Sequence, residues 1–336
     1  MLILSHGDVR KILDGAEQEV LAAVRTAYVL HTQGRSAVPH SVFLRFPGDE
    51  RNRIIALPAY LDAPESPVAG VKWVSSFPGN VQAGMDRASA AIILNSMRTG
   101  HPEVFLEGAT ISARRTAASA AVAAATLGAT GSGVSLVGSG VINFEVLSFL
   151  SALYPELDSV TVFDLDQARA TAFADRCTTR WPEMKVDVAT GVEDALAAHP
   201  LVCLATSATV PHLDVSRCQP GALILHLSLR DLTPETILAS TNVVDDADHV
   251  CRAATSLHLA EQRTGNRDFI AHSLGELLLD GDRYRRNPNA LTVFSPFGLG
   301  ALDLALADLV HRRARERGLG THVPDFLGSG LPDPRR

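Results

Sequence analysis

The feature that most constrains the fold of this chain is an apolar stretch that runs directly into two closely spaced glycines. Residues 134–137 are Val-Ser-Leu-Val, and Gly138-Ser139-Gly140 follows at the start of a helical pattern. Gly138 permits a tight turn, while Gly140 lets the backbone N–H groups of a helix N-terminus approach a pyrophosphate. Asn143 replaces the third glycine of this fingerprint, which leaves an ordinary turn as the alternative. The pattern predicts a nucleotide site between a buried strand and a helix.

The second half of the chain alternates between apolar strands and helices. We expect strands at 133–137, 159–164, 185–188, 201–205, 222–227 and 242–244. Helices are expected at 144–153, 167–181 and 192–198. Strands that are apolar along their whole length are buried on both faces, so the alternation predicts an α/β fold with a doubly wound parallel sheet of the Rossmann type.

The N-terminal part of the chain has a different pattern. Apolar residues at helical spacing predict one helix over 8–31, with Ser5 as its N-cap. Short strands are expected at 41–46, 53–57, 69–74 and 90–95. Together they predict an antiparallel or mixed sheet. An alanine-rich helix over 111–127 would link the two parts, and a last helix over 299–317, capped by Gly318, would return to the first part.

Polar residues follow two of the predicted strands where a bound nucleotide would lie. Asp164 comes 26 positions after Gly138, near the place of the carboxylate that binds a ribose 2′-hydroxyl. A carboxylate there favours NAD because it would repel the 2′-phosphate of NADP, although Arg169 lies nearby. The alternative is that Asp164 caps the following helix. Thr206, at the carboxyl end of another strand, is a predicted cofactor contact.

Four charged residues are candidates for chemistry on a substrate. Asp231 follows an apolar strand at the same edge of the sheet, where it could accept a proton or could cap the next helix. Lys72 lies within an apolar strand and is either turned to solvent or buried with a lowered pKa. Arg45 and Arg115 could each bind a carboxylate or be surface charge. Combined with a nucleotide fold, they point to hydride transfer on a substrate that carries carboxylate and amine groups.

Composition argues against several other classes of protein. The 336 residues carry 30 Lys and Arg against 37 Asp and Glu, a net charge of −7, which disfavours nucleic acid or an anionic membrane as a partner. No segment reads as a membrane span or a leader peptide, so a cytoplasmic protein is expected. The four cysteines form no CxxC pair and the histidines form no HExxH motif, so neither disulfides nor a metal site is expected.

The order of these motifs resembles that of the ornithine cyclodeaminase/μ-crystallin family over nearly the whole chain. The matching positions are Arg45, Lys72, Thr99-Gly100-His101-Pro102, Arg115-Thr116-Ala117-Ala118, Gly138-x-Gly140 and Asp231. The segments that resemble the branch making L-2,3-diaminopropionate are 85–89, 92–95, 107–112, 228–231 and 295–298. Members of that branch oxidise N-(1-amino-1-carboxy-2-ethyl)-L-glutamate with NAD to 2-oxoglutarate and L-2,3-diaminopropionate, a precursor of siderophores and peptide antibiotics. The resemblance implies this reaction.

The resemblance also implies roles for individual positions. Lys72 and Asp231 would form an acid/base pair. Substrate carboxylates would be bound by Arg45 and Arg115, with Arg87 near the substrate. The expected cofactor-binding positions are Thr116, Gly138, Ser139, Gly140, Val141, Ile142, Asp164, Thr206, Ser228 and Phe297. NAD is the implied cofactor, an amino acid with several carboxylates is the implied substrate, and no metal is implied.

An arrangement in two lobes follows from the same resemblance. Residues 116–301 would form the Rossmann NAD-binding domain, and residues 1–115 with 302–336 a smaller α+β lobe that binds substrate and forms a homodimer. Cyclodeaminases usually carry a Gly-Lys pair after the catalytic Asp, whereas Leu232-Thr233-Pro234 stands here, so conversion of ornithine to proline and ammonia is the alternative reaction. A ketimine reductase, an alanine dehydrogenase-like enzyme and a μ-crystallin-like binding protein stay open as further alternatives.

Overall fold

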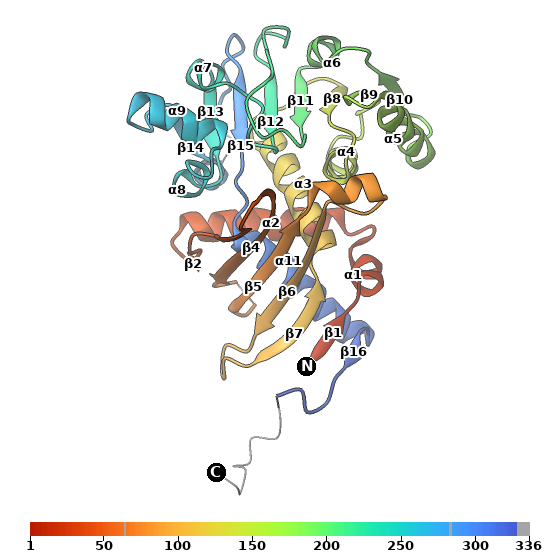
Figure 1. Cartoon of the computed structure of the whole chain (residues 1–336), viewed down its shortest axis with the longest axis vertical. Helices are drawn as coiled ribbons and strands as arrows, with labels where there is room; N and C mark the ends of the chain where they lie inside the picture. The colour runs from red at the N-terminus through yellow and green to blue at the C-terminus, as the bar shows by residue number, and fades with distance from the viewer. Residues whose placement is uncertain (64, 282–283, 328–336) are drawn as a thin grey trace, which may run out of the picture.

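The computed structural model describes residues 1–63, 65–281 and 284–327. Residues 328–336, which the sequence assigns to the first lobe, lie outside the described residues, as do residue 64 of that lobe and 282–283 of the predicted NAD-binding domain. The described residues form two eight-stranded sheets, which lie one above the other in Figure 1. The predicted α/β fold, with a parallel sheet and a second sheet of mixed type, is confirmed.

The lower sheet in Figure 1 is built mainly from the N-terminal part of the chain. Its strands are β1 (Leu2–Leu4), β2 (Ser36–Ala37), β3 (Val42–Phe46), β4 (Asp49–Leu61), β5 (Val68–Ser76), β6 (Ala88–Asn95), β7 (Pro102–Glu107) and β16 (Thr321–His322). Their order is β16-β1-β7-β6-β5-β4-β2, with β3 paired to β4. β1 runs parallel to β7 while the other pairs are antiparallel, so the sheet is mixed.

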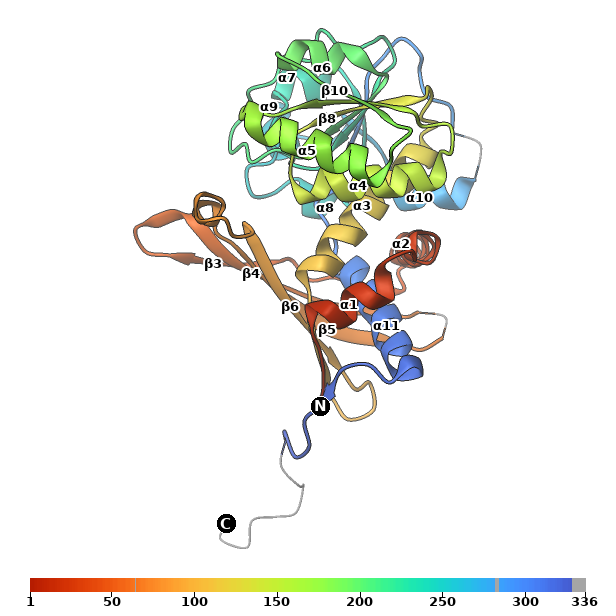
Figure 2. The ribbon, with the colours of Figure 1, turned by 90° about the vertical axis from the view of Figure 1, so that its right-hand side faces the viewer.

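Helices cover one face of this mixed sheet (Figure 2). They are α1 (His6–Leu13), α2 (Glu17–Thr32), the lower part of α3 (Ala109–Thr126) and α11 (Gly300–Arg317), and a short 3₁₀ helix, η1 (Pro78–Ala83), joins β5 to β6. The predicted single helix over 8–31 is wrong, because Gly15 adopts a left-handed φ of 79° between α1 and α2. Ser5 is the predicted N-cap and accepts a hydrogen bond from Asp8 N. Gly318 ends α11 with a φ of 62°, also as predicted.

The upper sheet is parallel throughout, as the alternating pattern predicts. Its strands are β8 (Gly133–Val137), β9 (Ser159–Phe163), β10 (Lys185–Val188), β11 (Leu201–Leu204), β12 (Leu223–His226), β13 (Thr241–Val244), β14 (Ile270–Ser273) and β15 (Thr292–Ser295). The strand order is β10-β9-β8-β11-β12-β15-β13-β14. The chain winds outward in opposite directions from β8, and ligands bind at the carboxyl edge of such a switch point. Sequence reasoning did not anticipate β14 and β15.

The helices of the upper sheet follow the strands in sequence. They are α4 (Val141–Leu153), α5 (Gln167–Arg180), α6 (Val192–Ala198), α7 (Pro234–Leu238), α8 (Ala247–Val250), α9 (Ser256–Thr264) and α10 (Leu274–Asp280). The alanine-rich α3 runs from the mixed sheet to the parallel sheet (Figure 1) and contacts α2, α4 and α11. Small alanine side chains allow this close approach between helices. Of the helices described, none combines the length and apolar character needed to cross a membrane.

Candidate active site

The glycine-rich turn after β8 is shaped by backbone contacts that no other residue type allows. Gly138 has a left-handed φ of 96°, and a Cβ on it would come 2.5 Å from Ala205 O. Gly140 is the N-cap residue of α4, and a Cβ there would meet no atom within 4 Å. The first N–H groups of α4 receive no side-chain cap. These uncapped N–H groups are therefore available to donate to an anion.

Asn143 stands in place of the third glycine of the fingerprint and forms part of the turn. Its side chain is buried and its Nδ2 donates to Val137 O at 3.0 Å and to Gly138 O at 2.6 Å. These bonds tie the first turn of α4 to the end of β8. The departure from the fingerprint thus supports the turn geometry, since the amide donates to Gly138 O and shares Val137 O with Ala205 N.

Asp164 stands directly after β9 and turns back to the glycine-rich turn. Its Oδ2 accepts hydrogen bonds from Ser139 N at 2.8 Å and Ser139 Oγ at 2.6 Å. Burial would raise the pKa of Asp164, but these hydrogen bonds outweigh burial and leave the pKa lowered, so the carboxylate is charged. The capping alternative is wrong, because Asp166 caps α5 by accepting from Ala168 N and Arg169 N.

Asp231 is fully buried at the carboxyl edge of the same sheet, beyond β12. Thr206 Oγ1 and Ser228 Oγ both donate to its carboxylate. Burial would raise the pKa of Asp231, yet the bonds from His226, Ser228 and Thr206 lower it below the usual range. The capping alternative is wrong here too, because Thr233 is the N-cap of α7. The predicted cofactor contacts Thr206 and Ser228 therefore lie against Asp231.

A buried histidine behind Asp231 was missed by sequence reasoning. His226 Nε2 lies 3.3 Å from Asp231 Oδ2, and its Nδ1 lies 3.1 Å from Ser295 Oγ at the end of β15. Burial lowers the pKa of His226 in spite of the neighbouring carboxylate. The only signal in the sequence was its place at the end of an apolar strand, five residues before Asp231. We call Thr206, His226, Ser228 and Asp231 the Asp231 cluster.

A second buried cluster lies in the mixed-sheet lobe and centres on Asp303 of α11. Asp303 Oδ2 is 2.6 Å from Lys72 Nζ, and Arg115 Nε donates to Asp303 Oδ1 at 2.9 Å. Lys72 Nζ also donates to Ser112 Oγ at 3.2 Å. Lys72 and Arg115 are both buried, so the alternatives that placed them at the surface are wrong. Sequence reasoning did not identify Asp303, which completes what we call the Asp303 cluster: Lys72, Ser112, Arg115 and Asp303.

The surroundings of Lys72 in the Asp303 cluster change the pKa of its ammonium. Burial lowers the pKa of its ammonium and Asp303 opposes this effect, while the Arg115 charge adds to it; together they bring the pKa from 10.5 to about 8. An unfolded lysine keeps its proton up to higher pH, so the buried ammonium destabilises the fold below about pH 8. That penalty is relieved as the pH rises from about 8 to 10.5.

The segment from β15 to α11 joins the two clusters. Ser295 contacts His226, and Gly298 lies against the guanidinium of Arg115, where a Cβ would come 2.7 Å from Nη1. Three residues of chain span at most about 10 Å, so the clusters are neighbours. Asp245 holds the segment by accepting from Phe297 N at 2.9 Å and Gly298 N at 2.6 Å. Lys72 and Asp231 nevertheless contact different partners and share no ion pair among the described residues.

The remaining predicted positions lie on α3, on α4, on β3 and just before β6. Thr116 is one turn after Ser112 on α3, and its Oγ1 donates to Ser112 O at 2.7 Å. Val141 is exposed and Ile142 half-buried in the first turn of α4. Arg45 on β3 and Arg87, just before β6, are exposed and contact neither Lys72 nor Asp303. Among the described residues, no group of three or more His, Cys, Asp or Glu is placed to hold a metal ion.

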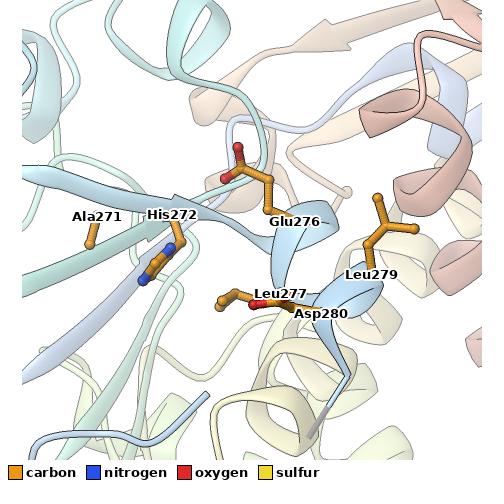
Figure 3. A pocket seen from close by; sticks show the side chains of 6 residues that line it. All are labelled: Ala271, His272, Glu276, Leu277, Leu279 and Asp280. Atoms are coloured by element: carbon orange, nitrogen blue, oxygen red, sulfur yellow. The ribbon is translucent and has the colours of Figure 1, made fainter. Parts of the chain in front are cut away.

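Figure 3 shows a depression elsewhere, between β14 and α10, with a volume of about 460 Å³. Its lining residues are Ala271, His272, Glu276, Leu277, Leu279 and Asp280. None of them belongs to the predicted site. The carboxylate of Glu276 is already engaged, because it accepts from Ser273 N at 2.7 Å to complete the N-cap of α10. The candidate active site is therefore at the Asp231 and Asp303 clusters.

These features define a two-lobed α/β protein with a glycine-rich turn at the edge of a parallel sheet and two neighbouring clusters of buried charge. The chain belongs to the ornithine cyclodeaminase/mu-crystallin family, whose sequence model matches residues 3–318. An N-((2S)-2-amino-2-carboxyethyl)-L-glutamate dehydrogenase of Staphylococcus aureus is 26% identical over 96% of this chain and 97% of its own length.

Solved structures of other proteins resemble this chain over nearly its whole length. A Thermococcus litoralis Δ1-pyrroline-2-carboxylate reductase in complex with NADH and L-proline superposes with a TM-score of 0.89 at 26% identity, covering 96% of this chain and 100% of that one. An archaeal alanine dehydrogenase dimer with bound NAD gives a TM-score of 0.87 at 25% identity, covering 97% and 99%. Relatives of this fold therefore act on different amino acids and imino acids.

The titration of Lys72 can be measured directly because the sequence contains three lysines, of which Lys11 and Lys185 are exposed. We expect the side-chain NMR resonance of Lys72 to titrate with a pKa of about 8. Replacing Asp303 by Asn removes the carboxylate that holds the proton on Lys72, so the pKa should fall below about 8. The control is Asp308→Asn on the same helix, where the carboxylate pairs with Arg312. An unchanged Lys72 pKa in Asp303→Asn would contradict the cluster.

Proposed function

We propose that this chain is an NAD-dependent oxidoreductase that cleaves N-(1-amino-1-carboxy-2-ethyl)-L-glutamate to L-2,3-diaminopropionate and 2-oxoglutarate. The observation that carries the proposal is the pair of buried clusters, one carboxylate at the nucleotide edge and two cations beside it. The similarity to the Staphylococcus aureus dehydrogenase along almost the full chain supports this choice of substrate. The diamino acid product would serve siderophore or peptide-antibiotic assembly.

NAD fits the residues at the carboxyl edge of the parallel sheet. The open space at Gly140 and the free N–H groups of Val141 and Ile142 suit a pyrophosphate, and Ser139 lies in the same turn. The charged Asp164 suits ribose hydroxyls and disfavours a 2′-phosphate. Thr116 would contact a cofactor phosphate, while Phe297 and the Asp231 cluster would lie near the nicotinamide. When bound, NAD supplies the acceptor for the hydride of the substrate carbon.

The two clusters would have different roles: the Asp303 cluster would bind the substrate, and Asp231 would act at the reacting amine or at water. Lys72 and Arg115 would bind the carboxylate beside the carbon that is oxidised, and Asp303 keeps both cations in place. Asp231, whose pKa is lowered, stays ionised and accepts a hydrogen bond from the secondary amine or from water. Lys72, with a pKa of about 8, is the group that can exchange a proton near neutral pH.

The chemistry balances with one water molecule. The glutamyl α-carbon loses a hydride and the secondary amine loses a proton, which leaves an imine. Water adds to the imine carbon, and cleavage of the C–N bond releases 2-oxoglutarate and the primary amine. Asp231 would orient the water for this attack, and Lys72 would move the proton to the leaving nitrogen.

The first test is NADH absorbance after the enzyme is mixed with NAD and N-(1-amino-1-carboxy-2-ethyl)-L-glutamate, with L-ornithine and L-alanine in parallel. We expect stoichiometric NADH from the first substrate only. Single-turnover rates for Asp231→Asn and Lys72→Ala should fall by about a hundredfold or more, as for loss of a general acid or base. Asp308→Asn serves as the control for both variants.

Other outcomes would replace the proposal. Proline and ammonia from ornithine without net NADH would identify a cyclodeaminase, and NADH from alanine an alanine dehydrogenase. Binding of NAD with no turnover of any substrate would favour a binding protein. If both variants stay within about threefold of wild type, the assignment of Lys72 and Asp231 is wrong.

A separate test addresses the cofactor. Asp164→Ala removes the carboxylate that would bind the ribose hydroxyls, so the affinity for NAD relative to NADP should fall by about tenfold. Fluorescence titration with NADH and NADPH measures this ratio. Asp166→Ala is the matched control: it should lower the melting temperature by removing the α5 cap and leave the cofactor ratio unchanged. An unchanged ratio in Asp164→Ala would remove Asp164 from the site.

We also propose that the chain forms a homodimer through the mixed sheet. Helices cover one face of this sheet, and the opposite face is uncovered (Figure 2). That face carries Trp73 and Phe105, which are 46% and 41% exposed, with Val42 and Leu44 on β3. Trp73 pairs with Ala56 and Ala91 on the neighbouring strands, which extends the apolar surface. Exposed apolar sheet faces of this kind commonly mark subunit contacts.

The dimer can be tested by sedimentation velocity. Wild type should sediment with twice the mass of the chain, and Trp73→Asp combined with Phe105→Asp should sediment as a monomer because charge would be placed in the apolar contact. Leu279→Asp, at an exposed apolar position on α10, should leave the dimer intact. A monomeric wild type, or a doubly substituted dimer, would contradict the proposal.

A further inference from the structure

Three arginines line up at one end of the mixed sheet. Arg45 on β3 is the register partner of Arg53 on β4, and Arg53 is the partner of Ser76 on β5. Ser76 in turn pairs with Ala88, the first residue of β6, and Arg87 precedes it. The backbone of Arg87 accepts a hydrogen bond from Phe77 N at 2.8 Å, which holds it beside the end of β5. Arg53 was not recognised from the sequence.

A fourth arginine comes from the parallel sheet. Arg230 precedes Asp231, and its Nη2 donates to Ala253 O at 2.7 Å. The backbone on both sides of this contact is strained, because Leu229 and Ala253 have left-handed φ values of 68° and 53°. Ser256 N donates to Leu229 O at 2.8 Å and holds the strained segment in place. Such strain persists where the surrounding contacts hold a side chain in a required position.

The four arginines form no ion pairs among the described residues; burial and the charges of Arg45 and Arg87 lower the pKa of Arg230, although the charge of Asp231 opposes these effects. No carboxylate among the described residues lies within ion-pair distance of any of them. Burial lowers the pKa of Arg53, and the charges of Arg230, Arg87 and Arg45 lower it further. Arg53 Nε is buried without a hydrogen-bond partner. In a chain with a net charge of −7, a concentration of unpaired cations calls for an anionic ligand.

We propose that Arg53 and Arg230, together with Arg45 and Arg87, form a subsite for a carboxylate of the substrate that is remote from the reacting carbon. The inference rests on the proposed function for the position of the reacting end, because Lys72 and Arg115 hold the carboxylate beside that carbon. The subsite favours amino acids with a second carboxylate. It disfavours alanine, which has no group to reach it, and ornithine, whose distal ammonium it repels.

Two oxo acids that differ by one carboxylate provide the probe. 2-Oxoglutarate carries the distal carboxylate and 2-oxopentanoate lacks it. The full-length protein is titrated with each by calorimetry, first without nucleotide and then with NADH. Wild type should bind 2-oxoglutarate at least about tenfold more tightly, as expected for a carboxylate paired with guanidinium groups. Arg53→Ala and Arg230→Ala should each remove most of this preference and leave binding of 2-oxopentanoate unchanged.

The matched control is Arg51→Ala, which removes an exposed arginine from the same strand, two residues before Arg53. It should keep the wild-type preference. Arg53→Lys should restore part of it, since the charge returns without the planar guanidinium. In turnover, Arg53→Ala should raise KM for N-(1-amino-1-carboxy-2-ethyl)-L-glutamate with little effect on kcat, which a general loss of structure would not produce.

The outcomes separate this inference from the proposed function. Suppose that Arg53→Ala and Arg230→Ala form NADH with the wild-type KM and keep the wild-type preference between the oxo acids. This result would overturn the subsite but not the proposed reaction. A preference for 2-oxoglutarate that depends on both arginines, without NADH from the proposed substrate, would support the subsite and overturn the reaction. Equal binding of both oxo acids by wild type would overturn the subsite regardless of turnover.

Discussion

The interaction on which the site depends is the ion pairing of one buried carboxylate, Asp303, with two buried cations. Lys72 comes from β5, Arg115 from α3 and Asp303 from α11, so one group of charges joins three elements of the mixed-sheet lobe. Removing either partner of a buried ion pair leaves an uncompensated charge, at a cost of about 3–5 kcal/mol. The same arrangement leaves one net positive charge on the cluster, because two cations share a single carboxylate. In the proposed function, this surplus charge would attract a carboxylate of the substrate.

The β15–α11 connection links this cluster to the nucleotide edge. Ser295 contacts His226 behind Asp231, while Gly298 packs against Arg115. Buried Asp245 holds the connection through two backbone N–H groups, and burial raises its pKa in spite of these bonds. Because a single short segment touches both clusters, the position of the Asp303 cluster is coupled to the position of Asp231. A pyrroline-2-carboxylate reductase and an alanine dehydrogenase share this fold, so the fold alone does not define the substrate.

The four arginines of the proposed subsite would supply a physical basis for the choice of substrate. Arg45, Arg53 and Arg87 belong to the mixed sheet and Arg230 to the parallel sheet, and the charges of Arg45 and Arg87 lower the pKa of Arg230. Mutual repulsion disfavours this arrangement, and a bound dicarboxylate would relieve it. The strained backbone at Leu229 places Arg230 in this position beside Asp231. The same loop would then supply both functions: Asp231 would act at the reacting carbon, and Arg230 would bind the distal carboxylate of the substrate.

The sequence by itself determined the parts that depend on local order. The turn at Gly138, the capping of α1 and α11 and the parallel alternation of strands follow from short-range sterics and periodicity, which neighbouring residues specify. Only the tertiary structure decided that Lys72 is buried and that Arg115 pairs with Asp303 across 188 positions of chain. Asp303 and Arg53 carry no local pattern that separates them from solvated charges. Their roles arise from strands and helices that meet in space, and the energy of a charge depends on what surrounds it there.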